Sequence, residues 1–133
     1  MSPQGMAGPV KPGELLSEPE VALLTRALSE WGGPAHCSPQ LAVGMGFTGT
    51  QDLYDQCRRL RQALGDNTPL TAADWARTLL ATEIVFVSDL AGSGVEWPTT
   101  TGRDEAETLQ LLRAIQRKLA PTVSPYYGKT PSD

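Results

Sequence analysis

The stretch TAADWARTLLATEIVFVSDLAGSG, residues 71–94, decides the fold. Apolar side chains recur on nearly every side of it, which is typical of a helix that other helices surround. Thr71 followed by Asp74 predicts the helix start, because the hydroxyl can accept from the Asp74 N–H and the carboxylate can reach back to the Thr71 N–H. The glycines within residues 91–94 predict its end. We therefore expect a buried central helix over about 72–90.

Two helices are expected in the N-terminal third of the chain, before residue 50. Ser17 and Glu20 have the spacing of a capping box, followed by apolar residues at helical spacing. A Gly-Gly-Pro run then predicts the end of that helix. The pair Ser38-Pro39 predicts the start of a short second helix.

The same signals predict one helix just before the central segment and one after it. A helix over about 50–64 would have Gly65 as its C-cap, and a regular helix would cover about 103–119. Residues 95–102 have no helical period and are expected to form a loop pinned by Trp97. The predicted fold class is all-α, a compact orthogonal bundle of four to five helices around the central one.

Both ends of the chain are rich in proline and glycine. Residues 1–13 have little to bury and are predicted to be a disordered tail, and residues 121–133 a flexible tail. Residues 14–120 are expected to be a single helical domain.

Composition limits the cellular setting and the partners. The 133 residues carry a net charge of −4, which argues against a nonspecific binder of polyanions. Cys37 and Cys57 show no metal-binding or disulfide spacing, and no segment resembles a signal peptide or a membrane span. We expect a cytoplasmic protein that does not contact a membrane. Arginine outnumbers lysine, which is typical of a GC-rich genome such as an actinobacterium's.

No pattern of catalytic residues is visible, so we expect no enzyme, no cofactor and no metal. His36 beside Cys37 is interpreted as an exposed side chain next to a half-buried one, since a zinc site would need two more ligands. Glu83 lies in the apolar central helix and is interpreted as a structural carboxylate paired with Arg77 or Arg113.

Arg58, Arg59 and Arg61 lie late on the helix expected at 50–64. Residues 41–60 have the spacing of a helix-turn-helix unit with Gly46 in the turn, and Thr48 and these arginines would then contact nucleic acid.

The second half of that unit is similar to the motif of AraC-type regulators. Gly46-Phe47-Thr48 stands where that family has Gly-Phe-Ser, Leu53 and Cys57 stand at its two apolar positions, and Arg58 where it has a base. The resemblance covers about 25 residues and implies a DNA-binding transcriptional regulator. Asp52 and Asp55, however, place two carboxylates on the face that would approach phosphate, so we expect no tight binding to duplex DNA at physiological salt.

Three functions remain open from the sequence. The first is a non-enzymatic regulatory protein that acts through contacts with another protein or with itself as a homodimer, using the aromatic residues Phe47, Tyr54 and Trp97 at partly exposed positions. The second is the helix-turn-helix regulator. The third is a helical bundle or enzyme with a small-molecule pocket lined by Glu83, Trp75 and Trp97.

Overall fold

The computed structural model describes residues 8–32 and 35–128. These residues form seven α-helices and one short 3-10 helix, with isolated bridges but no strand, so the all-α prediction is confirmed. There are more helices than the four to five expected, because a short segment near the N-terminus and most of residues 95–102 are helical as well. In chain order they are α1 (Pro12–Leu15), α2 (Glu18–Glu30), α3 (Pro39–Gly44), α4 (Thr50–Asp66), α5 (Ala72–Val87), the 3-10 helix η2 (Gly94–Glu96), α6 (Trp97–Thr101) and α7 (Glu105–Tyr127).

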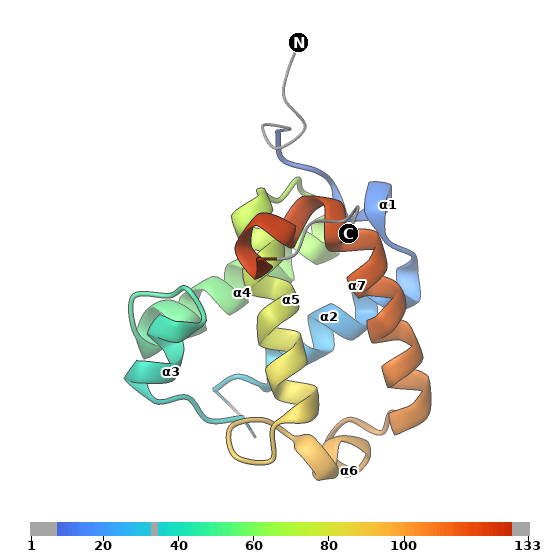
Figure 1. Cartoon of the computed structure of the whole chain (residues 1–133). Coiled ribbons are helices and arrows are strands. Elements are labelled where there is room, and N and C mark those ends of the chain that lie inside the picture. The colour runs from blue at the N-terminus through green and yellow to red at the C-terminus, as the bar shows by residue number, and fades with distance from the viewer. Residues whose placement is uncertain (1–7, 33–34, 129–133) are drawn as a thin grey trace.

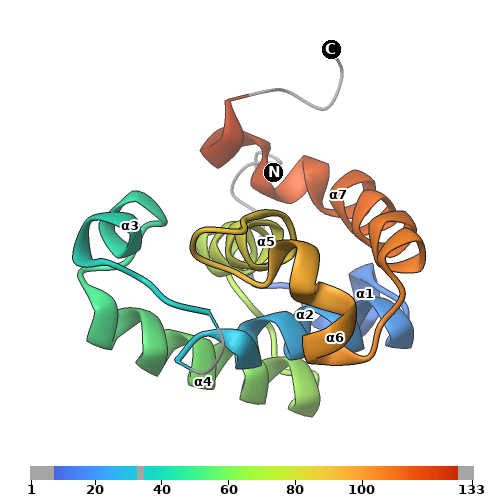
Figure 2. The same cartoon turned by 90° about the horizontal axis from the view of Figure 1, so that it is seen from below.

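Helix α5 runs through the middle of the bundle (Figure 1). Helices α2 and α4 lie together on one side of it, α7 runs along its flank, and α3 stands on the opposite flank (Figure 2). Trp75, Leu79 and Val85 of α5 are buried, as are Leu24 and Leu28 of α2. These side chains belong to a single core, which agrees with the prediction of a central helix.

The start of α5 follows the sequence signal in part. The Thr71 hydroxyl accepts from the Asp74 N–H at 3.1 Å. The Asp74 carboxylate does not return to Thr71, as the capping-box prediction required. It accepts two hydrogen bonds from the Arg59 guanidinium of α4, at 2.7 and 3.2 Å, and lies 3.6 Å from Arg77. A charged partner on a neighbouring helix replaces the local bond, because charge-assisted bidentate hydrogen bonds are stronger.

Several predicted boundaries are wrong by a few residues or more. Helix α5 ends at Val87, and Leu90 beyond it is exposed. Gly65 lies inside α4, whose C-cap is Asn67 in the left-handed conformation. Residues 95–102 are not a loop, since most of them belong to η2 and α6.

The turn between α5 and η2 packs directly on the end of α5. The Ser93 N–H donates to the Val85 carbonyl at 2.7 Å, and the Ser93 hydroxyl donates to the Glu30 carboxylate at 3.3 Å. Glu30 of α2 is 2% exposed and is paired with Arg26 at 3.2 Å. The turn therefore joins the end of α5 to the end of α2.

The N-terminal part of the chain that the structure describes is docked, contrary to the predicted tail. Val10 and Leu70 exchange two backbone hydrogen bonds, each 2.9 Å. The Val10 carbonyl also accepts from the indole N–H of Trp75 at 3.3 Å, and Pro12 is buried. Backbone groups, which the apolar pattern does not reveal, hold this segment in place. Residues 1–7 of the predicted tail lie outside the described residues.

The predicted C-terminal tail is also wrong as far as residue 127. Helix α7 continues through Pro121 and Pro125 to Tyr127, and it turns across the end of the bundle over α5 (Figure 1). Proline removes a helical hydrogen bond and kinks a helix without always ending it. Here Val123 is buried and the Tyr127 hydroxyl donates to Glu83 at 2.9 Å, so tertiary contacts hold the last turns. Residues 129–133 lie outside the described part.

Candidate functional site

The aromatic residues expected at a partly exposed surface are mostly buried. Phe47 is 3% exposed and Trp97 is 0% exposed, so that expectation is wrong for both. The Arg77 guanidinium lies over the Phe47 ring, and Phe86 meets Trp97 edge to face. The Trp97 indole donates to the Thr108 hydroxyl at 2.9 Å. Only Tyr54 of the three is half-buried and open to a partner.

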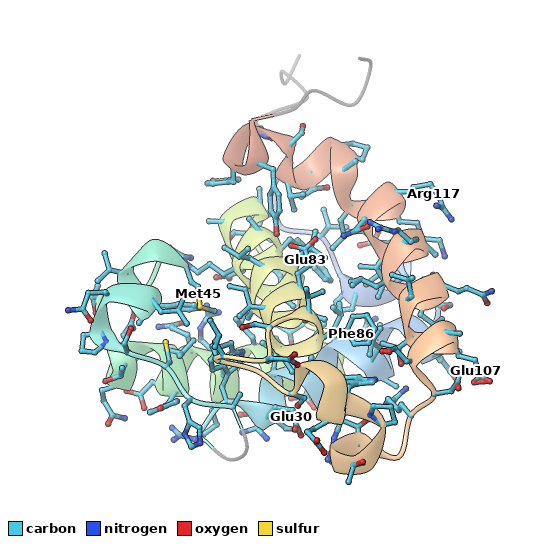
Figure 3. The ribbon with its side chains drawn as sticks, turned by 60° about the horizontal axis from the view of Figure 1, so that its bottom comes forward. Glu30, Met45, Glu83, Phe86, Glu107 and Arg117 are labelled. Atoms are coloured by element: carbon cyan, nitrogen blue, oxygen red, sulfur yellow. The ribbon has the colours of Figure 1, made fainter. Side chains whose placement is uncertain are left out.

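Glu83 and Trp75, which were expected to line one pocket, contact different parts of the protein. Glu83 is half-buried where α5 meets the end of α7 (Figure 3), and its carboxylate accepts from Gln116 at 2.7 Å and from Tyr127 at 2.9 Å. Its partners are therefore neutral donors of α7, not Arg77 or Arg113 as predicted. Burial, reinforced by the charge of Glu83, raises the pKa of Tyr127, which keeps this donor protonated. Trp75 is buried and bonds to Val10, so it is not open to a ligand.

Cys37 and Cys57 lie near enough that, besides burial, the charge of Cys37 raises the pKa of Cys57, but they belong to no metal-binding cluster in the described part of the chain. His36 is exposed and Cys37 is half-buried, as interpreted from the sequence. Burial raises the pKa of the Cys57 thiol to about 12, so it is protonated and unreactive at neutral pH. Within residues 8–32 and 35–128, no group of three or more His, Cys, Asp or Glu side chains is placed to hold a metal ion. Among the same residues, no helix is both long and apolar enough to cross a membrane.

The three arginines of α4 have separate roles. Arg59 is held by Asp74 of α5, and Arg58 lies 3.4 Å from Asp55 of its own helix. The Nε atom of Arg61 is shielded from solvent and has no hydrogen-bond partner among the described residues. Arg58 and Arg61 line one hollow together, as their spacing predicts, and Arg59 points elsewhere.

The helix-turn-helix residues lie on a surface of mixed charge. Thr48 is exposed, and its N–H donates to the Asp52 carboxylate at 3.0 Å. That bond is the leading cause of the lowered pKa of Asp52, which is therefore ionised at neutral pH. Asp55 is also exposed, and its carboxylate accepts from Gln51 at 3.0 Å. The arginines of α4 are thus accompanied by carboxylates along the same helix.

A groove opens over the outward side of α5, and we call it the α5 groove. Its floor is formed by α5 and its walls by the end of α3 and the end of α7, with a volume of about 200 Å³. Met45, on the α3 side, is labelled in Figure 3. The residues that line it are Gly44, Met45, Gly46, Ala73, Ala76, Arg77, Leu80, Tyr126 and Tyr127.

The apolar face of α5 is only partly covered there. Ala73 and Leu80, which line the groove, are half-buried, and Val87, seven residues further along the same side of the helix but outside the groove lining, is 69% exposed. Tyr126 on the α7 wall is 59% exposed. Arg77 is the cation of the groove, and its Nε donates to the Gly46 carbonyl at 3.0 Å. A helix that is apolar all round is thus left open on one side.

A second concavity, the α2–α4 hollow, lies between the end of α2 and the exposed side of α4. Its volume is about 470 Å³. Leu28, Trp31 and Cys57, all buried, form its apolar part. The polar part of its lining is formed by Ser29, Gln51, Tyr54, Arg58 and Arg61, with Gly32 completing the rim.

Sequence reasoning missed three features of these sites. Tyr126 and Tyr127 were placed in a tail, although two adjacent aromatic residues in a polar segment are themselves a sign of docking. Arg77 was considered only as a partner for Glu83. The contribution of α2 to the hollow beside Arg58 had no signal in the sequence, because it depends on how two distant helices pack.

Comparisons with known proteins give one partial likeness. The chain is 37% identical over 94 residues to a DNA ligase of Bacillus pumilus (strain SAFR-032). The match covers 67% of this chain and 13% of the ligase, so the chain corresponds to a small part of that enzyme's length. No family model and no solved structure matches the chain.

Proposed function

We propose that this protein is a non-enzymatic interaction module that binds a segment of a partner protein in the α5 groove. The observation that carries the proposal is the uncovered apolar side of the central helix. Isolated apolar residues on a surface need no explanation, but a continuous apolar face between two raised walls is typical of a protein-binding site.

The size and charge of the groove define the partner segment. A volume of about 200 Å³ accepts one large aliphatic or aromatic side chain between Leu80 and Tyr126. Arg77 at the edge forms an ion pair with Asp74 at 3.6 Å, too long for a hydrogen bond, and the hydrogen bonds of Asp74 are made with Arg59. The guanidinium of Arg77 therefore has capacity for a carboxylate. We propose a segment with a large apolar residue next to an acidic one.

The test is a selection of random displayed peptides against the full chain, followed by titration of the best binder. We expect the selected peptides to combine a large apolar residue with Asp or Glu. Tyr126→Ser and Arg77→Gln should each weaken binding about tenfold, since each removes a contact of about 1–2 kcal/mol. Leu109→Ser is the matched control, because Leu109 is an exposed apolar residue of α7 outside the groove.

Two results would contradict this proposal. Peptides without the apolar and acidic pair would mean that the groove recognises something else. Equal weakening by Leu109→Ser would mean that binding is not in the groove. If instead the free chain forms a dimer in sedimentation experiments and Tyr126→Ser abolishes it, the occupant is a second copy of the chain.

DNA binding through α3 and α4 is the second candidate function, and the likeness to part of a DNA ligase favours it. The charge distribution opposes it, because Asp52 and Asp55 accompany the arginines and Arg59 is occupied by Asp74. We expect no submicromolar binding of labelled genomic fragments at ~150 mM salt. Tight binding that is lost in an Arg58→Ala/Arg61→Ala double variant would make DNA binding the leading function.

A further inference from the structure

The α2–α4 hollow brings two guanidinium groups to one side of the molecule, away from the α5 groove. Arg58 and Arg61 lie nearly one turn apart on α4 and both line the hollow. Asp55 is the carboxylate paired with Arg58, at 3.4 Å, and its charge is shared with a hydrogen bond from Gln51. Two cations therefore face one carboxylate, and the hollow has an excess of positive charge.

Arg61 has unused hydrogen-bonding capacity. Its Nε atom is shielded from solvent, and no acceptor in the described part of the chain is within hydrogen-bond distance. A buried donor without a partner costs stability, and a bound ion or water is one way in which such a donor is satisfied. The N–H groups of guanidinium have the geometry to hold a carboxylate or phosphate through two parallel bonds.

Besides the arginines, the hollow combines the polar side chains of Ser29 and Gln51 with one aromatic side chain open to it, that of Tyr54. Leu28, Trp31 and Cys57 are buried beneath it, and the half-buried Tyr54 ring stands at its side. A volume of about 470 Å³ is within the range of sites for small organic molecules. An inorganic ion would use the arginines and leave the Tyr54 ring exposed to water. A molecule that combines an acidic group with a flat apolar body would cover both.

We propose that the α2–α4 hollow binds a small aromatic anion, with its acidic group on Arg58 and Arg61 and its ring against the half-buried Tyr54. This site is independent of the proposed protein-binding groove, since the two share no lining residue. The protonated thiol of Cys57 contributes packing and takes no part in covalent chemistry.

The test uses two fluorescent probes that differ in charge. 8-Anilinonaphthalene-1-sulfonate carries a sulfonate, and N-phenyl-1-naphthylamine has the same aromatic framework without it. We expect the full chain to bind the sulfonate probe more tightly. An Arg58→Gln/Arg61→Gln double variant should bind the sulfonate probe about tenfold or more weakly than the parent chain does. Its affinity for the neutral probe should be unchanged.

Arg117→Gln is the control for the loss of a surface arginine as such, because Arg117 is exposed on α7 outside the hollow. The proposal is overturned if the double variant binds the sulfonate probe like the parent chain, or if Arg117→Gln weakens it equally. It is also overturned if the double variant loses affinity for both probes to the same extent while it still unfolds cooperatively. Competition with benzoate and phenyl phosphate shows whether the hollow prefers a carboxylate or a phosphate, and displacement by neither contradicts the proposal.

Discussion

Replacement of Trp75 by alanine is expected to lower the free energy of unfolding by about 3–5 kcal/mol. The side chain is 0% exposed, and its removal leaves a cavity at the centre of the core. The indole N–H also donates to the Val10 carbonyl, so the variant would release the N-terminal segment paired with Leu70. A loss of this size approaches the total stability of a small domain.

The measurement is urea unfolding followed by far-ultraviolet circular dichroism. Tyr126→Ala is the matched aromatic control, since Tyr126 is exposed and should cost about 0.5 kcal/mol or less. A loss below about 1 kcal/mol for Trp75→Ala would mean that this ring is not in the core. Trp75→Phe should recover part of the loss, because it refills most of the cavity without restoring the hydrogen bond.

The signals that predicted the fold correctly are local. Ser17 and Glu20 form the expected capping box, and Thr71 caps α5, because each pair is three residues apart and is fixed by the helix itself. The apolar residues of α5 likewise identified the central element. Such patterns can be read without knowing where the neighbouring helices lie.

The predictions that failed depend on contacts between distant residues. The Asp74 carboxylate accepts a hydrogen bond from Arg59, fifteen positions away, and the capping box is therefore incomplete. Trp97 was expected at a surface, but it packs against Phe86 and bonds to Thr108. The prolines of α7 predicted a break, and the contact of Tyr127 with Glu83 holds the helix past them. Tertiary packing outweighed local propensity in each case.

The candidate sites were predictable to different degrees. Helical spacing places Arg58 and Arg61 on one side of α4, and both of them line the α2–α4 hollow, which the sequence did not predict. The apolar lining supplied by Trp31 could not be foreseen, since it depends on the packing of α2 against α4. The α5 groove arises because the apolar surface of α5 is larger than its neighbouring helices cover, and the sequence shows the apolar surface but not which side stays open. An all-apolar helix has fewer neighbours than it needs, so one side remains open.

Gly92→Ala should have the second largest effect, a loss of about 3 kcal/mol in unfolding free energy. A Cβ at Gly92 would overlap the Cα of Val85 and the carbonyl oxygens of Val85 and Ile84. These are backbone atoms of α5, and they cannot rotate away as a side chain could. The turn would have to lift, which breaks the bond from the Ser93 N–H to Val85 and pulls the Ser93 hydroxyl from the buried Glu30.

Gly65→Ala is the control that separates this clash from the general effect of adding a methyl group. Gly65 lies inside α4 with open space around it, so alanine there should raise stability by about 0.5–1 kcal/mol. The two variants carry the same chemical change and should shift the thermal midpoint in opposite directions, with Gly92→Ala falling by about 10 °C. Equal behaviour of the two would mean that the turn does not rest on α5. A selective loss at Gly92 would show that this turn packs directly against the backbone of α5, where a Cβ would meet Val85 and Ile84.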